Sequence, residues 1–382
     1  MKLFKTALPA ALLAGGVLFL CACAAPAEST PAPSETGSSA PASTPAPQTE
    51  TVIETGAYVF PGGARNASEY FTVEELDLPD TINGMDYWFY DFIDESVLLV
   101  QLTDARNNIP EQREFGALNI LTGEYKTLFT VPEGESYGLS CTDGRYAVCS
   151  RHDEANGDYF IRLFDLSTGE GRDIYTYAPV YKGINVPLGP EVLLDGCLYF
   201  SDAMPGEDAT GRMQLLCYNI GTGDLSTVAE NASCPVVVDG QLAWVAGPDE
   251  QGNYALAGAD GETTPLEERP ISLTAAGGKL YSLRWREPGE LFTIRYLAEL
   301  ETGRSLMETV MSVDQLRGGS LALTWYNYDE EVPALWLPDE GCVAVFSGLD
   351  KAYNSFRLGE DEIFLHCGHD NAPSRYYRIL PK

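Results

Sequence analysis

Apolar and polar residues alternate along most of this chain after about residue 60, which is the pattern of half-buried β-strands. The run Phe160–Leu166 is an example, since it reads Phe-Ile-Arg-Leu-Phe-Asp-Leu and then stops at Thr168-Gly169. No long stretch carries the three-to-four-residue periodicity of an amphipathic helix. The pattern therefore predicts an all-β fold.

Turn sequences recur at the ends of these alternating runs. A Gly after Thr can adopt positive φ, and in this position it predicts a hairpin built on a type I turn with a bulge. The clearest copies are Leu121–Glu124, Ser167–Glu170, Gly221–Asp224 and Glu301–Arg304, with Asp260-Gly261 and Glu340-Gly341 as degenerate copies.

A second set of turns precedes each of these hairpins. Its members are Asp94-Glu95, Asp143-Gly144, Asp195-Gly196, Asp239-Gly240, Gly277-Gly278, Gly318-Gly319 and Gly359-Glu360. Two hairpins per repeat of about 40 to 50 residues predict a β-propeller of four-stranded blades. Seven blades are expected, with six or eight as alternatives.

The last repeat ends after two or three strands, at Lys382. An outer strand from the N-terminal part of the chain would complete this blade, and the candidates are Gly56–Phe60 and Tyr70–Leu76. Closure of the ring in this way removes unpaired strand edges that would invite aggregation.

The two kinds of connection in such a blade lie on opposite faces, because successive strands run antiparallel. All the tight turns fall in one class. The other class holds the long loops Thr103–Gln112, Arg151–Asp158, Ser201–Met213, Gly247–Asn253, Tyr326–Val332 and Gly368–Pro373, together with Tyr177–Pro190 between blades. Long loops on one face of a rigid scaffold are where binding residues gather.

Acidic residues are frequent in these long loops. The candidate binding residues are Asp153, Glu154, Asp158, Asp202, Asp249, Asp329 and Glu330, joined by the aromatic residues Trp325 and Tyr328. A ring of carboxylates would attract a basic protein or a divalent cation. The alternative is a merely solvated rim.

Two of these loops suggest particular ligands. The segment Asp153–Asp158 resembles a calcium loop but lacks the alternating acid spacing of an EF-hand, so calcium is the one cofactor considered. The segment Trp325–Glu331 sets aromatic rings beside carboxylates, as glycan sites often do. Packing of these aromatic rings between blades is the alternative.

The first residues predict where the protein is located. Lys2 and Lys5 precede an apolar stretch, Thr6–Leu20, which ends in Leu20-Cys21-Ala22-Cys23. This leader resembles that of a bacterial lipoprotein, which implies a signal peptide over residues 1–22, lipidation of Cys23 and an extracytoplasmic protein anchored to the cell membrane. The alternative is an uncleaved membrane helix.

Composition divides the rest of the chain. Residues 23–51 are almost wholly Ala, Pro, Ser, Thr and Glu, which predicts a disordered tether, followed by the propeller over residues 52–382. A net charge of −32 excludes nucleic acid as a partner. Seven Cys follow the leader without C-x-x-C spacing. We therefore expect buried free thiols, with Cys141 and Cys149 as the pair to form any bridge.

The Thr-Gly-Glu turns are similar to those of secreted propellers of the TolB-like and quinoprotein-like kinds. This resemblance implies the fold for residues from about 55 onward. The quinoprotein repeat places a Trp a few residues after Thr-Gly, and the segments that start at Tyr125, Gly171 and Leu225 lack one. Quinone binding is therefore not expected.

Signatures of catalysis are few. Gly134–Gly138 matches the G-x-S-x-G pattern of serine hydrolases but has no strand-turn-helix context, and the chain has 3 His. The sequence therefore favours a non-catalytic, surface-tethered binding or scaffold protein that recognises a protein or a glycan. The alternative is an extracellular carbohydrate-active enzyme, a glycoside hydrolase or lyase with carboxylates at the propeller mouth.

Overall fold

The computed structural model describes residues 64–382 except 107–108, 182–190, 208–211, 268, 271, 286–294, 302–304, 308–309, 316–320, 328–329, 347–348, 350–352, 360–361 and 370–371. The leader, the tether and the lipidation residue Cys23 lie outside this part of the chain. Within the described residues, no helix has the length and apolar character needed to span a membrane.

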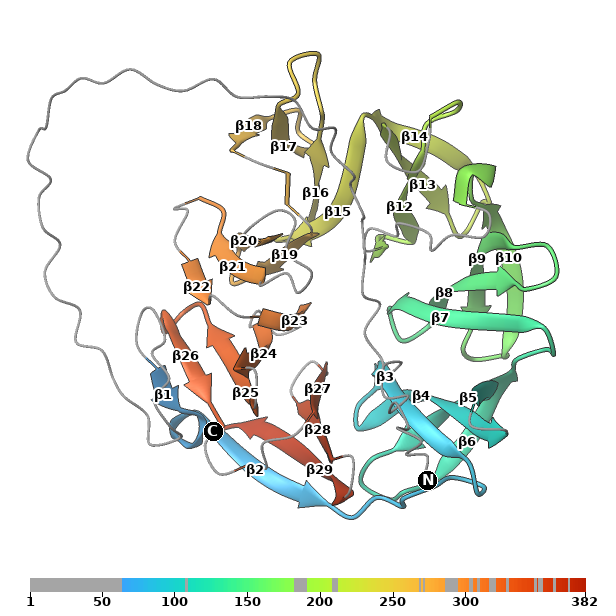
Figure 1. Ribbon diagram of the computed structural model, residues 1–382, viewed down its shortest axis with the longest axis vertical. Helices are drawn as coiled ribbons and strands as arrows, with labels where there is room; N and C mark the ends of the chain where they lie inside the picture. The colour runs from blue at the N-terminus through green and yellow to red at the C-terminus, as the bar shows by residue number, and fades with distance from the viewer. Residues whose placement is uncertain are drawn as a thin grey trace, which may run out of the picture.

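The described strands form seven sheets (Figure 1). Five of these sheets consist of four consecutive strands each. The first and second blades hold β3 (Asp86–Asp94), β4 (Val97–Arg106), β5 (Ile109–Asn119) and β6 (Tyr125–Thr130), and then β7 (Glu135–Thr142), β8 (Tyr146–Asp153), β9 (Asp158–Asp165) and β10 (Glu170–Thr176). The next three hold β11 (Val192–Leu194), β12 (Cys197–Ala203), β13 (Met213–Asn219) and β14 (Leu225–Glu230); β15 (Ala232–Val238), β16 (Gln241–Ala246), β17 (Tyr254–Gly258) and β18 (Thr263–Leu266); and β19 (Ser272–Ala276), β20 (Lys279–Trp285), β21 (Arg295–Glu299) and β22 (Ser305–Met307).

The other two sheets each take a strand from the N-terminal side. They are β23 (Val310–Gln315), β24 (Leu321–Asn327), β25 (Glu330–Leu337) and β26 (Cys342–Val345) with β1 (Ala64–Asn66), and β27 (Tyr353–Leu358), β28 (Ile363–His369) and β29 (Ala372–Pro381) with β2 (Phe71–Leu76). Two short 3₁₀ helices, η1 (Ala67–Glu69) and η2 (Pro179–Tyr181), complete the described elements.

The sheets are arranged as a ring. Their first strands contact one another in the order β3, β7, β11, β15, β19, β23 and β27, and β27 in turn contacts β3. These strands lie innermost, with the later strands of each sheet further out (Figure 1). The expected fold class is confirmed: the chain is an all-β β-propeller with four-stranded blades.

The N-terminal segment completes the last blade. Strand β2 pairs antiparallel with β29, from Phe71 opposite Pro381 to Leu76 opposite Tyr376. The expected closing strand at Tyr70–Leu76 is therefore confirmed, and the other candidate, Gly56–Phe60, lies outside the described residues. The sequence did not predict β1, which adds a parallel fifth strand to β26.

The seam where the ring closes is held by polar contacts as well as by packing. Ser96, in the turn after β3, donates from its Oγ to Glu362 Oε1 at 2.9 Å, and Arg378 donates to Glu362 Oε2 at 2.5 Å. The Arg357 guanidinium donates to the Phe89 carbonyl at 2.8 Å. These contacts join the first and last blades in sequence order.

The core lies between neighbouring blades, where each sheet buries one face against the next. At the seam, Phe89 and Leu98 pack with Phe364 and Tyr376. Equivalent clusters fill the following interfaces. The alternation seen in the sequence is therefore that of strands with apolar side chains in these interfaces.

None of the seven cysteines of the described chain forms a disulfide. Cys149 lies opposite Leu139, whereas Cys141 lies opposite Val148 after a register shift. Cys149 packs toward the preceding blade and Cys141 toward the following one. The bulge turns the two side chains apart, so Cys141 and Cys149 are not the pair that the sequence suggested.

Candidate functional site

The connections between strands lie on two faces of the ring, because successive strands of each blade run antiparallel. Tight turns join β3 to β4, β5 to β6 and their equivalents in the next blades, and they are bonded to each other within a blade. Ile120 N donates to Ser96 O at 2.9 Å, and Ile220 N donates to Gly196 O at 3.0 Å. The connections from β8 to β9, from β12 to β13 and from β16 to β17 leave from the opposite ends of the strands, and we call this side the long-loop face after the last two of them.

Three segments that the sequence predicts to be long loops are instead mostly strand. In Thr103–Gln112, β4 ends at Arg106 and β5 begins at Ile109; in Tyr326–Val332, β24 ends at Asn327 and β25 begins at Glu330; in Gly368–Pro373, β28 ends at His369 and β29 begins at Ala372.

The Asp153–Asp158 loop is built around its first carboxylate. Asp153 accepts hydrogen bonds from the backbone N–H groups of Ala155 and Asn156 and, at 3.0 Å, from the Asn156 side chain. These bonds lower the pKa of Asp153 below its usual value, with the Asn156 side chain as the largest cause. Asp158 lies directly opposite Asp153 across the hairpin. Glu154 is exposed.

The loop between β16 and β17 repeats this construction. Asp249 accepts from Gln251 N at 2.9 Å, from Asn253 N at 2.8 Å and from the Asn253 side chain at 3.0 Å. These bonds lower the pKa of Asp249. Asp153 and Asp249 therefore stabilise the shape of their own loops, and the neighbouring Glu154 and Glu250 present charge to solvent.

Asp202 differs from the other candidates because it is buried, with 2% of its surface exposed. It accepts hydrogen bonds from Tyr175 Oη at 2.5 Å, Ala178 N at 3.2 Å and Ala203 N at 2.8 Å. Burial raises the pKa of this carboxyl above its usual value. Asp202 thus fixes the chain that leaves β10, instead of lining an exposed rim.

The remaining candidates belong to the segment 325–330. Trp325 in β24 is opposite Val332, and Glu330 in β25 is opposite Asn327, so the backbone places both at the long-loop end of this hairpin. Tyr328 and Asp329 lie outside the described residues. The structure therefore brings the described members of the predicted set to one face of the ring, without showing their side chains converging on one point.

Sequence reasoning missed Glu191, which is 5% exposed and precedes the innermost strand β11. Its carboxyl accepts hydrogen bonds from Ser140 Oγ and, at 3.0 Å, from Tyr177 Oη. Ser140 is the extra residue of the β7 bulge, and a bulge re-aims a side chain. Burial raises the pKa of Glu191 to about 7. The sequence offered only a lone acid before a short apolar run.

Metal and hydrolase chemistry were also considered at the level of side chains. Among the described residues, no group of three or more His, Cys, Asp and Glu side chains is placed to hold a metal ion. The Glu135–Gly138 part of the G-x-S-x-G match lies within strand β7, so it lacks the helix that such a nucleophile requires. Burial lowers the pKa of His366 to about 4, and its ring packs against Phe89 and Tyr376.

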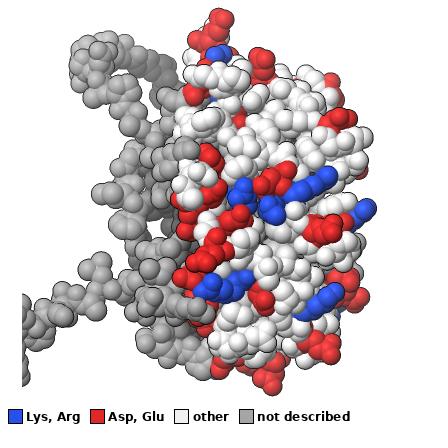
Figure 2. Space-filling view, turned by 90° about the vertical axis from the view of Figure 1, so that its right-hand side faces the viewer, with Lys and Arg blue, Asp and Glu red and all other residues white. Residues whose placement is uncertain are grey.

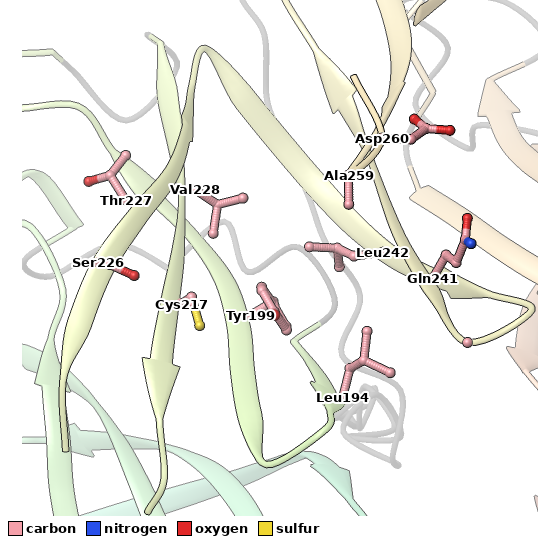
Figure 3. A pocket seen from close by; sticks show the side chains of 11 residues that line it. Leu194, Tyr199, Cys217, Ser226, Thr227, Val228, Gln241, Leu242, Ala259 and Asp260 are labelled. Carbon is pink, nitrogen blue, oxygen red and sulfur yellow. The ribbon is translucent and has the colours of Figure 1, made fainter. Parts of the chain in front are cut away.

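A cleft lies between the third and fourth blades in chain order (Figure 3). Its volume is about 620 Å³, and it is lined by residues of both blades, among them Leu194, Tyr199, Val228, Leu242 and Asp260. Residues of the tight turns, including Gly240 and Asp260, border it. The cleft is therefore separate from the long-loop face, and the sequence did not indicate it.

Charge is spread over the side of the molecule that shows the outer strands. Figure 2 shows acidic side chains along the whole height of this side, with a few basic side chains among them. Among the partly exposed basic residues, Arg162 pairs with Asp173 at 2.8 Å and Arg212 pairs with Glu207 at 2.6 Å. The surplus of acids over bases in the composition is thus visible on the surface.

Comparison with known proteins shows the fold. No protein-family model and no curated protein matches the chain. The chain is similar to the β-propeller domain of the Trilobed protease from Pyrococcus furiosus, with a TM-score of 0.52 and 11% identity over 78% of this chain and 94% of that chain. It is also similar to a prolyl endopeptidase, with a TM-score of 0.51 and 13% identity over 81% of this chain.

The chain spans 48% of that endopeptidase. TolB from Acinetobacter baumannii is a more distant neighbour, with a TM-score of 0.40 and 11% identity over 82% of this chain and 80% of that chain. Identities this low show a shared β-propeller fold alone. The class of protein defined so far is therefore an acidic β-propeller with one tight-turn face and one long-loop face.

Proposed function

We propose that this protein is a membrane-tethered lipoprotein whose propeller is a non-catalytic binding module for a basic protein or a glycan. The leader that ends at Cys23 supports the anchor, and the Ala-Pro-Ser-Thr-rich tether supports display of the propeller away from the membrane.

The observation that carries the binding role is the construction of the long-loop face. Two of its loops are held in shape by Asp153 and Asp249, whose carboxylates accept hydrogen bonds from backbone N–H groups of the same loop. The exposed acids beside them, Glu154 and Glu250, are then presented on preformed loops. Rigid loops on a closed scaffold lower the entropy cost of binding, and exposed carboxylates attract cationic partners.

The same observation disfavours the predicted carboxylates as a catalytic pair. A general acid and a base need carboxylates that face a common substrate. Asp202 is 2% exposed, and Asp153 and Asp249 are engaged in their own loops. The structural roles of these three residues leave binding as the function that the described geometry supports best.

Replacing Cys23 with Ser tests the anchor. We expect Cys23→Ser to move the protein from the membrane fraction to the medium, because the acyl chains can no longer be attached. Cys21→Ser is the matched control and should leave the protein in the membrane fraction. Retention of Cys23→Ser in the membrane would instead indicate an uncleaved helix. Site-specific cross-linking from the long-loop face tests the binding role.

A further inference from the structure

The cleft between the third and fourth blades arises from a difference among the turns. In three earlier blades, the turn between the third and fourth strands begins with a large apolar residue, which is Ile120, Leu166 or Ile220. These residues are 2%, 7% and 7% exposed. Each packs against the preceding blade, as Leu166 does against Phe129 and Leu128.

The fourth blade lacks this residue. Ala259 occupies the equivalent place, and it is exposed. The turn is also one residue shorter, since Asn219 N donates to Asp224 O in the third blade whereas Gly258 N donates to Glu262 O here. A smaller side chain on a shorter turn leaves space over the outer strand of the preceding blade.

That outer strand, β14, is exposed accordingly. Leu128 in β6 and Ile174 in β10 are half-buried, each as the extra residue of a β-bulge. Val228, the extra residue of the β14 bulge, is 38% exposed, and Leu225 is 47% exposed. In Figure 3, the Val228 side chain points toward the neighbouring sheet, which carries Leu242 and Ala259.

The charges around the cleft have one sign. The residues that line it include Asp260 and no Lys or Arg. Asp195, which is exposed, is the chain neighbour of the lining residue Leu194. The cleft therefore combines an apolar interior with an acidic border.

We propose that this cleft is a docking site for a partner-protein segment that carries an aliphatic side chain flanked by lysine or arginine residues. The aliphatic group would occupy the space that Ile220 and Leu166 fill in their own interfaces, and the basic groups would face the acidic border. This inference rests on the proposed function of the propeller as a binding module, and it adds a surface apart from the long-loop face.

Two synthetic peptides test the proposal with the full-length protein in detergent. Both are acetylated nine-residue peptides with four lysines, and they differ only in a central isoleucine or glycine. Isothermal titration should show that the isoleucine peptide binds roughly tenfold more tightly, the factor expected for burial of one aliphatic side chain. Because both peptides carry the same charge, the ratio excludes attraction by net charge alone.

Three variants locate the binding. Ala259→Ile should fill the cleft, abolish the tenfold preference and raise the midpoint of thermal unfolding. Val228→Lys should abolish the preference by placing a cation at the cleft. Val73→Lys is its matched control, since Val73 is 37% exposed on the outer strand β2, and this variant should keep the preference.

Equal binding of the two peptides to the wild-type protein would overturn the proposal. So would a preference that survives both Ala259→Ile and Val228→Lys. Self-association that Ala259→Ile abolishes would assign the cleft to a second copy of the chain and would also overturn it. The double variant Glu154→Lys with Glu250→Lys alters only the long-loop face. If it loses the binding partner of that face but keeps the preference for the isoleucine peptide, the two proposals are shown to concern separate sites.

Discussion

Individual carboxyl groups in this propeller have roles that their position in the sequence does not reveal. Asp153, Asp202 and Asp249 are alike as loop acids in the sequence, yet one is 2% exposed and two cap their own loops. The difference depends on which backbone N–H groups lie within reach, and that follows from the folded loop. The role of Glu191 could not be predicted from the sequence either, because its burial between β7 and β11 depends on tertiary packing.

Glu191 predicts a pH dependence of stability. Its pKa is raised from 4.5 to about 7 in the folded protein by burial, so the folded state holds a proton that the unfolded state releases. Stability from this group is fully present below pH 4.5, falls as pH rises, and is lost above about pH 7. The expected loss is about 1–3 kcal/mol in the free energy of unfolding.

Chemical denaturation between pH 4.5 and pH 8 measures this effect. Glu191→Gln should remove that part of the slope, because the amide does not titrate, while its oxygen and N–H groups retain partners in Ser140 and Tyr177. Glu154→Gln, at an exposed position, should leave the slope as in the wild-type protein. An unchanged slope in Glu191→Gln would refute the assigned role.

At the scale of elements, the turns could be predicted because their chemistry is local. The Thr-Gly turns at Gly123, Gly169 and Gly223 occur where expected, with φ of 71°, 74° and 79°. The fourth, at Gly303, lies outside the described residues. The structure adds the residue three before Thr, since Asn119 and Asn219 accept from the N–H groups of Thr122 and Thr222. The strand β1 and the cleft could not be predicted, because both depend on contacts between segments far apart in the sequence.

Substitutions of two glycines at the same turn position distinguish the cost of an unfavourable φ from the cost of a steric clash with the neighbouring blade. Gly123→Ala meets no atom within 4 Å and should cost about 1 kcal/mol, the cost of an unfavourable φ. Gly169→Ala would place its Cβ at 2.2 Å from the Leu128 carbonyl oxygen of the preceding blade. We therefore expect Gly169→Ala to lose at least about 2 kcal/mol more in unfolding free energy.

Urea denaturation of both variants measures the difference. Equal losses would show that the turn of one blade does not press on the outer strand of its neighbour.

At the scale of the whole molecule, the periodicity of the turns was enough to predict the propeller. The closing strand followed from the short last repeat, and Phe71–Leu76 fills that place. The sequence predicts on which side of the ring the binding loops lie, because strand direction determines where each loop emerges. It does not predict which side chains in those loops contact one another. Similarity to known propellers supports the fold and assigns no activity to this chain.

Cross-linking in the cells that produce the protein tests the central claim most directly. A photo-reactive phenylalanine analogue at position 154 or 250 lies on the long-loop face, and at position 124 or 170 it lies on the tight-turn face, all four at exposed residues. The account predicts a discrete cross-linked partner from 154 and 250, and none from 124 and 170, which lie on the first and second blades, away from the cleft between the third and fourth blades. Cross-links only from 124 and 170, or equal cross-links from both faces, would contradict it.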